Sequence, residues 1–245
     1  MTASSARLRE LIGSTARVVA LTGAGISAES GVPTFRGANG LWEKESVEDL
    51  ATPEGFARDP ARVWRWYDER RRQIASCRPN AGHRALAEYE RRRPGFTLVT
   101  QNIDDLHRAA GSSRLLELHG NIFRVRCCRE GTIRDDRRVP LPATPPLCGC
   151  GAMLRPDVVW FGEPLPEEVL GNAFGAARQA DLFLVIGTSA LVYPAAGLPQ
   201  IARERGAYLV EINIEPTSLS TGMDEVITGP AAGILPGLLG GGGAH

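Results

Sequence analysis

Residues 18–36 read Val-Val-Ala-Leu-Thr-Gly-Ala-Gly-Ile-Ser-Ala-Glu-Ser-Gly-Val-Pro-Thr-Phe-Arg, and this stretch decides the fold. A short apolar run that ends in Thr22-Gly23-Ala24-Gly25 predicts a buried parallel strand, then a glycine turn, then the start of a helix. Gly23, Gly25 and Ala28 fit the G-x-G-x-x-G/A pattern, in which small residues let the backbone approach a pyrophosphate beside a helix N-terminus. The stretch therefore predicts a dinucleotide site.

The residues after this pattern depart from an ordinary dinucleotide fold. An acidic residue is expected about 20 positions further on, at the end of a second strand, but Glu43 and Glu45 fall in a charged stretch with no strand before them. Residues 27–36 instead contain many turn-forming residues, which predicts a long loop that covers the cofactor.

Residues 23–36 closely resemble the GAGxSxxSGxPxFR signature of the sirtuins, the NAD-dependent protein-lysine deacylases. Further sirtuin-like segments follow in family order over nearly the whole chain: Thr100-Gln101-Asn102-Ile103-Asp104, His119-Gly120, Val159-Trp160-Phe161-Gly162-Glu163, Gly187-Thr188-Ser189 and Glu211-Ile212-Asn213. The resemblance implies an enzyme that consumes NAD and transfers an acyl group from a protein lysine, giving nicotinamide and an O-acyl-ADP-ribose.

Length and charge limit the class of protein. A chain of 245 residues can bury one sizeable core, as a single domain or a large domain with a small module. The formal net charge of zero provides no basic field for nucleic acid or anionic lipid. No apolar run approaches the length of a membrane span and no signal peptide is evident, so we expect a cytoplasmic protein without nucleic-acid or membrane partners.

The order of the predicted elements indicates a doubly wound, Rossmann-like α/β fold. After the first strand, apolar runs predict strands over residues 96–100, 115–118, 182–186, 208–212 and 224–227. Helical periodicity is found over residues 5–14, 59–77 and 81–93, and helical stretches separate most of the strands. Residues 43–80 and 123–152 do not fit this alternation, and we assign them to a smaller inserted module that is helical and could bind zinc.

Four of the five cysteines lie between residues 127 and 150, which favours a metal site in a reduced compartment over a disulfide scaffold. Many sirtuins hold a structural zinc with two C-x-x-C pairs, but here Glu130 stands at the second position of the first pair, and Cys148 and Cys150 are one residue too close. Cys127, Cys148 and Cys150, with either Cys128 or Glu130, could complete a tetrahedral site. The alternatives are a metal-free loop or a redox-labile cluster.

The candidate catalytic residues follow two predicted strands. His119 comes after the strand 115–118, and Gln101-Asn102-Ile103-Asp104 follows the strand 96–100. The carboxyl ends of parallel strands form the ligand crevice of such sheets, so these groups should lie together. A histidine there can titrate near neutral pH. His83 and His107 lack such neighbours in the sequence, and we interpret them as surface or packing residues.

The resemblance implies a role for each candidate residue. Asn102 and Asp104 would position the nicotinamide and its ribose, and Gln101 would contact ribose. His119 would act as the general base once the acyl-lysine oxygen has attacked the anomeric carbon. The remaining cofactor contacts implied are Gly23, Ala24, Gly25, Phe35, Arg36, Ile103, Gly187, Thr188, Ser189, Asn213, Ile214, Glu215 and Ala231.

The substrate groups come from two other segments. Val159 and Phe161 lie in a segment that, in sirtuins, pairs with the substrate peptide as an added strand. Tyr67 and Arg70 are three residues apart on one helical face, and this spacing resembles that of sirtuins that remove acidic acyl groups. Succinyl- and malonyl-lysine are therefore the expected substrates, along with acetyl-lysine. Mono-ADP-ribosyl transfer and a non-catalytic NAD or ADP-ribose sensor are the alternative functions.

Overall fold

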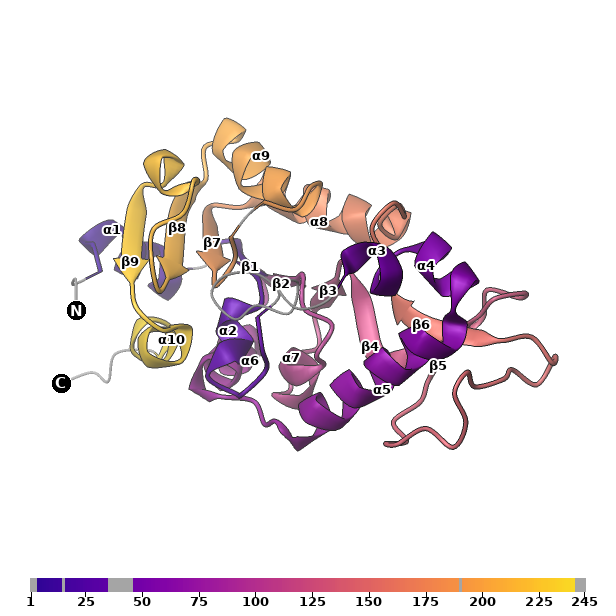
Figure 1. The fold of residues 1–245 in the computed structure, drawn as a ribbon. Coiled ribbons are helices and arrows are strands. Elements are labelled where there is room, and N and C mark those ends of the chain that lie inside the picture. Colours follow the sequence, from indigo (N-terminus) through magenta and orange to yellow (C-terminus); the bar gives the residue numbers. More distant parts are fainter. Residues whose placement is uncertain (1–3, 15, 35–45, 190, 241–245) are drawn as a thin grey trace.

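The computed structural model describes residues 4–14, 16–34, 46–189 and 191–240. Its main sheet is parallel and has the strand order β3-β2-β1-β7-β8-β9 (Figure 1). The strands are β1 (Val18–Thr22), β2 (Phe96–Thr100), β3 (Leu115–Glu117), β7 (Leu182–Ile186), β8 (Tyr208–Asn213) and β9 (Glu225–Thr228). The prediction of a doubly wound α/β fold is therefore confirmed.

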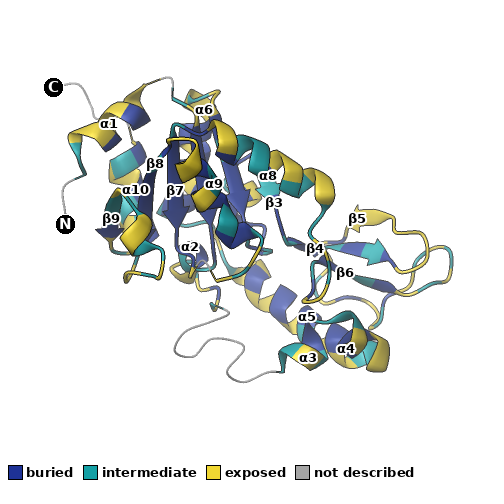
Figure 2. Ribbon diagram, turned by 90° about the horizontal axis from the view of Figure 1, so that it is seen from above, coloured by how far each residue is buried: buried dark blue, intermediate teal, exposed yellow. Residues whose placement is uncertain are grey.

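Helices cover both faces of this sheet, and the strands between them are mostly buried (Figure 2). Successive strand residues point to opposite faces, so Val18 and Ala20 pack on one side while Val19 and Leu21 pack on the other. The first side is covered by α1 (Ala6–Gly13), α6 (Ala81–Arg92) and α10 (Ala231–Leu239), and the second by α8 (Glu167–Gln179) and α9 (Leu198–Glu204). Burial on both faces explains why these strands are continuous apolar runs.

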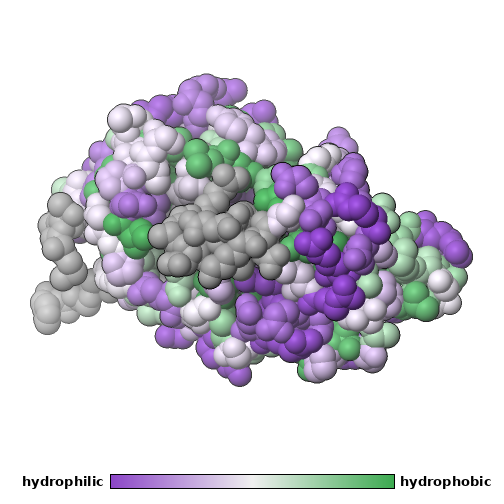
Figure 3. All heavy atoms as spheres, viewed as in Figure 1, coloured by the Kyte–Doolittle hydropathy of each residue, from purple (hydrophilic) through white to green (hydrophobic). Residues whose placement is uncertain are grey.

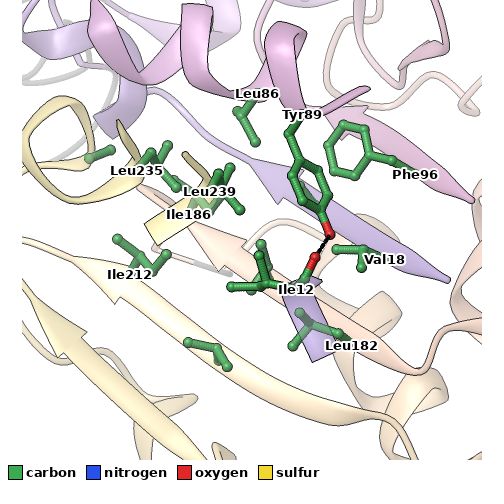
Figure 4. Packing of buried hydrophobic residues seen from close by; sticks show 14 of the residues in the cluster. Ile12, Val18, Leu86, Tyr89, Phe96, Leu182, Ile186, Ile212, Leu235 and Leu239 are labelled. Carbon is green, nitrogen blue, oxygen red and sulfur yellow. Dashed lines mark hydrogen bonds between the residues drawn. The ribbon is translucent and has the colours of Figure 1, made fainter. Parts of the chain in front are cut away.

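Tyr89 joins α6 to α1 within the first of these cores (Figure 4). Its ring packs edge-on against Phe96, with ring centroids 5.3 Å apart. Its hydroxyl donates a 3.0 Å hydrogen bond to the carbonyl of Ile12, so the buried phenol keeps a polar partner. Truncating a fully buried aromatic such as Phe96 to alanine would cost about 3–5 kcal/mol.

A second hydrophobic core lies beside the main sheet, on the right in Figure 1. It is built on an antiparallel sheet of order β5-β4-β6, whose strands are β4 (Gly120–Cys127), β5 (Ile133–Asp135) and β6 (Leu154–Val158). The helices α3 (Val47–Leu50), α4 (Pro53–Arg58) and α5 (Pro60–Ser76) pack on it. This small sheet was not predicted from the sequence. Its strand β6 also lies outside the segment 123–152 that was assigned to the inserted module. The module boundaries proposed from the sequence stay a prediction.

The connection between β3 and β4 places the second core next to the sheet edge where the predicted site residues lie. Gly120 has φ +80°, and a Cβ built on it would lie 2.1 Å from the carbonyl oxygen of Asp157, so only glycine fits. The main strands end level with one another, since Thr22 is opposite both Thr100 and Ile186. Within the described residues, no helix is long and apolar enough to cross a membrane.

Candidate active site

A cavity of about 650 Å³ lies at the carboxyl ends of the main strands and is lined by residues from both cores. Seventeen residues proposed from the sequence line it: Gly23, Ala24, Gly25, Tyr67, Gln101, Asn102, Ile103, His119, Val159, Phe161, Gly187, Thr188, Ser189, Asn213, Ile214, Glu215 and Ala231. A single cavity thus brings together most of the proposed cofactor residues and three of the four proposed substrate residues.

Asp104 and Arg70 line a second, much smaller cavity of about 10 Å³. The two cavities adjoin, because Ala24, Asn102 and Ile103 line both. Phe35 and Arg36, which were also proposed as cofactor contacts, lie outside the described residues.

The glycine turn after β1 packs against the turn after β7. The N–H groups of Gly23 and Gly25 donate to the carbonyls of Ile186 and Gly187, at 3.0 and 2.8 Å. A Cβ on Gly25 would come within 2.8 Å of the Gly187 backbone, so this glycine is required by the protein itself. Among the described residues only the N–H of Ala24 in this turn has no partner, which leaves it to a ligand in the cavity.

The single-turn helix α2 (Gly25–Ala28) follows this glycine turn.

Thr188 links three strand ends around the cavity. The side-chain amide of Gln101 donates to the Thr188 hydroxyl at 2.9 Å, and that of Asn213 donates to the Thr188 carbonyl at 3.1 Å. The loops after β2, β7 and β8 are thereby held in fixed relation, which suits an extended ligand such as a dinucleotide.

His119 is oriented by a backbone carbonyl. Its Nδ1 lies 2.9 Å from the carbonyl oxygen of Gln101. Since a carbonyl can only accept, Nδ1 carries the proton and Nε2 of the neutral ring keeps its lone pair. Burial lowers the pKa of His119 below its ordinary value of 6.5, although the bond to Gln101 opposes this shift. The ring is therefore prepared to accept a proton at neutral pH.

Ser27 connects the two catalytic candidates that follow β2. Its hydroxyl donates to Oδ2 of Asp104 at 2.6 Å, while Oδ1 of Asp104 accepts from the N–H of Leu106 at 2.9 Å. The side-chain amide of Asn102 donates to the carbonyl of Gly23 at 3.0 Å and approaches the Ser27 hydroxyl at 3.3 Å. Burial is the main cause that raises the pKa of Asp104. Both polar groups are thus held at fixed positions beside the cavities.

His83 and His107 are both buried, so the surface interpretation is wrong for them and the packing interpretation holds. Nδ1 of His83 accepts from the N–H of Asn80, so Nε2 carries the proton toward the Ser27 hydroxyl at 3.3 Å. Burial lowers the pKa of His83 to about 4, with the charge of Arg84 adding to the effect. Sequence reasoning missed that Ser27 and His83 support Asp104. The one available signal was the position of Ser27 inside the glycine-rich signature.

The segment Val158–Glu163 forms the wall of the cavity on the side of the second core. The N–H of Val159 donates to the carbonyl of His119 at 3.0 Å, and the N–H of Phe161 donates to that of Ala51 at 2.9 Å. Sequence reasoning did not assign several other lining residues, which follow β6, β7 and β8: Trp160, Leu165, Val192, Tyr193 and Thr217. Their position after strand ends was the available signal.

Four side chains of the second core form a candidate metal centre. The ligand atoms of Cys127, Glu130, Cys148 and Cys150 all lie within 4.8 Å of one another. The Cys127 and Cys150 sulfurs are 3.6 Å apart, close to the roughly 3.8 Å edge of a tetrahedron with 2.3 Å zinc–sulfur bonds. Of the two candidates for the fourth ligand, Glu130 belongs to this group, whereas the Cys128 side chain is exposed outside it. The donors therefore fit a closed zinc site.

Comparisons with known proteins match these features. The Sir2 family model matches residues 23–194. An NAD-dependent protein deacylase of Aquifex aeolicus is 54% identical over 204 residues, which cover 83% of this chain and 85% of that protein. A solved Sir2 homologue–NAD complex has a TM-score of 0.89 and 43% identity, over 96% and 92% of the two chains. A Sir2 with a deacetylated p53 peptide and 3′-O-acetyl ADP ribose has a TM-score of 0.87 and 33% identity, over 98% of each.

Proposed function

This chain belongs to the Sir2 family and is an NAD-dependent protein deacylase, and we propose that it prefers succinyl- and malonyl-lysine to acetyl-lysine. One observation carries this preference. The Arg70 side chain is buried, with 4% of the residue exposed, and among the described residues its hydrogen bonding is limited to a 3.5 Å contact with Gln73 Oε1. No carboxylate of the described residues pairs with it.

Arg71, the next residue in the helix, provides a comparison, because its role is structural. Arg71 is fully buried and donates to the carbonyls of Ile122, Asp136 and Arg138. Arg72, an exposed arginine of α5, forms ion pairs with Asp68 and Glu69. The surface over α3 and α5 is hydrophilic (Figure 3). Arg70 has neither kind of partner. Its guanidinium lies over the Trp66 ring, 5.7 Å from the centroid, a contact that does not neutralise the charge. A buried guanidinium without a carboxylate partner is costly, and an anionic ligand would remove that cost.

Tyr67 and Ala51 support the same assignment. Tyr67 lies one helical turn before Arg70, lines the large cavity, and interacts electrostatically with Arg70. Ala51 lines this cavity as well, and its small side chain leaves room for an acyl group. A guanidinium offers paired donors to a carboxylate, whereas an acetyl group offers it no charged partner.

The proposed catalytic roles follow from the contacts. Bound NAD would supply a ribose whose bond to nicotinamide breaks as the acyl oxygen attacks. Asn102 and Asp104 would position the nicotinamide and its ribose, Gln101 would contact the ribose, and the N–H of Ala24 would bind a phosphate. His119, neutral and fixed through Nδ1, accepts a hydroxyl proton at Nε2. A zinc ion held by the second core would be structural, because its protein donors complete the coordination.

The acyl preference is tested with peptides that carry succinyl-lysine or acetyl-lysine in one sequence. Each charge-assisted hydrogen bond is worth about 1.5–3 kcal/mol, so the ratio of kcat/KM values should favour succinyl-lysine by roughly 10- to 100-fold per bond. Arg70→Met should abolish that ratio. Arg72→Met, which alters an exposed arginine of the same helix, should retain it. A succinyl preference that survives in Arg70→Met would refute the assignment.

A second assay tests the proposed reaction itself. Nicotinamide release should require the acylated peptide and should cease in His119→Ala. Release without peptide would instead indicate ADP-ribosyl transfer or NAD hydrolysis, and NAD binding without release would indicate a sensor. The cytoplasmic location and the absence of nucleic-acid partners stay predictions.

A further inference from the structure

Trp160 makes a polar contact that simple packing does not require. Its indole N–H donates a 3.0 Å hydrogen bond to the hydroxyl oxygen of Tyr67, between the β6–α8 connection and α5. Both side chains are almost completely buried, and both residues line the large cavity. The contact therefore joins the cavity wall formed by Val158–Glu163 to Tyr67, the residue proposed to contact the acyl group.

Arg155 and Glu163 fix the position of the Trp160 side chain, and the Phe56 ring packs beside it. The guanidinium of Arg155 lies 3.5 Å from the centre of the ring, and the Phe56 ring centroid lies 5.2 Å away. Arg155 is itself held by a bidentate pair with Glu163, at 2.5 and 2.8 Å. Glu163 Oε2 also accepts the backbone N–H of Trp160 at 2.9 Å. The indole N–H is consequently aimed at Tyr67 by a rigid arrangement.

The direction of the Tyr67 hydroxyl proton follows from counting donors and acceptors. A phenol has one proton to donate and accepts through its lone pairs. Because an indole N–H can only donate, the Tyr67 oxygen must accept from Trp160. Elsewhere in the described chain, no acceptor takes the Tyr67 proton. The proton is thus left for a ligand in the cavity that Tyr67 lines.

We propose that Trp160 is a specificity-positioning residue: its indole N–H occupies a lone pair of the Tyr67 oxygen and so directs the phenol proton toward the acyl carboxylate. This inference rests on the proposed preference for acidic acyl groups. Tyr67 stays a neutral donor, because burial raises its pKa above the ordinary value of 10.0. Arg70 then supplies the charge and Tyr67 the oriented hydroxyl.

A double-mutant cycle tests the role of Trp160 with matched succinyl and acetyl peptides. Trp160→Phe keeps an aromatic ring but removes the N–H, and Tyr67→Phe removes the hydroxyl. Each should lower the succinyl-to-acetyl ratio of kcat/KM about tenfold, the worth of one oriented hydrogen bond, mainly through a higher KM for the succinyl peptide. In the double variant this ratio should fall no further than in the more strongly affected single variant, because both changes disrupt the same Trp160–Tyr67 interaction.

Phe56→Leu provides the matched control, because it alters packing against the Trp160 ring without touching the hydrogen bond. It should shift the ratio less than twofold. An equal loss in Phe56→Leu and Trp160→Phe, or additive losses in the double variant, would overturn the role of Trp160. A wild type with no succinyl preference would overturn the proposed function itself, whereas a preference that Trp160→Phe leaves intact would overturn this inference alone.

Discussion

The hydroxyl of Ser27 donates a 2.6 Å hydrogen bond to Oδ2 of Asp104, across a separation of 77 residues in the sequence. This bond connects helix α2 to the polar segment after β2. The other oxygen of Asp104 is bound by the N–H of Leu106. Both carboxyl oxygens are therefore occupied by donors, and the position of the side chain is fixed before any ligand arrives.

Asp104→Asn should reduce turnover far more than stability. The amide nitrogen cannot accept from Ser27 or from Leu106, so one donor loses its partner, at a cost of about 1–3 kcal/mol in unfolding free energy. We expect kcat to fall at least about 100-fold, since one misplaced group in a preorganised site has an effect of that order. Asp135→Asn, on the exposed strand β5, serves as the control. Equal fractional losses of stability and activity in urea-unfolding and turnover assays would contradict the prediction.

The acidic limb of the pH–rate profile should lie below pH 6.5. The base must be unprotonated, and burial lowers the pKa of His119 from that ordinary value. Activity should thus persist to more acidic pH than an exposed histidine would allow. The measurement is kcat/KM between pH 5 and 9. A limb above pH 6.5 would show that His119 is not the titrating base.

Stability should fall as the pH is lowered from about 6.5 to about 4, in part because of His83. Burial lowers its pKa from the ordinary 6.5 to about 4 in the folded protein, so within this window the unfolded chain binds a proton that the folded protein does not. The full loss amounts to about 3 kcal/mol. His107, whose pKa is also lowered, adds to the loss.

His83→Asn should make the stability less dependent on pH within this window, as measured by urea unfolding at several pH values. The remaining dependence would come from His107 and other groups with lowered pKa values. An unchanged slope in the variant would show that His83 does not titrate as inferred.

Zinc content should depend on Glu130 and not on Cys128. The carboxylate of Glu130 lies with the three thiols, whereas the Cys128 side chain is exposed outside that group. Protein purified without chelator should contain one zinc per chain in wild type and in Cys128→Ser. Glu130→Ala should lose the metal to a competing chelator more readily, and Glu130→Cys should retain it better, because thiolate binds zinc strongly. A loss in Cys128→Ser instead would assign the fourth ligand to that cysteine.

Gly25→Ala should damage folding as well as NAD binding. The added methyl group would meet the Gly187 backbone at 2.8 Å, an overpacking worth about 1–3 kcal/mol. Gly175→Ala, in α8 with open space around it, should be neutral or slightly stabilising. Thermal unfolding and calorimetric titration with NAD measure the two effects. A variant that loses NAD affinity but keeps full stability would show that the turns tolerate a side chain.

The main sheet could be predicted because its strands are buried on both faces and therefore appear as unbroken apolar runs. The small sheet could not be predicted, because β4 and β6 contain charged residues that form ion pairs with residues far away in the sequence. Arg124 and Arg126 on β4 both bind Asp157 on β6, and nothing local in the sequence indicates that contact.

Within the site, the sequence motifs identified most of the side chains that line the large cavity. They could not show that Arg70 lacks a carboxylate or backbone carbonyl partner while Arg71 donates to three carbonyls. The two residues are chemically identical, and only the carbonyls that surround Arg71 in space distinguish them.

The second core and the strand ends of the main sheet supply different parts of the lining of the shared cavity. Tyr67 and Trp160 belong to the second core, whereas Gly187 and Asn213 lie at the ends of main-sheet strands. Under the proposed assignment of Tyr67 and Arg70 to the acyl group, mutations that repack the second core should change which acyl group is accepted while the dinucleotide loops stay in place. Descendants of one ancestral chain could therefore diverge in acyl preference without losing their cofactor, and an engineer could exchange the corresponding segments between relatives for the same purpose.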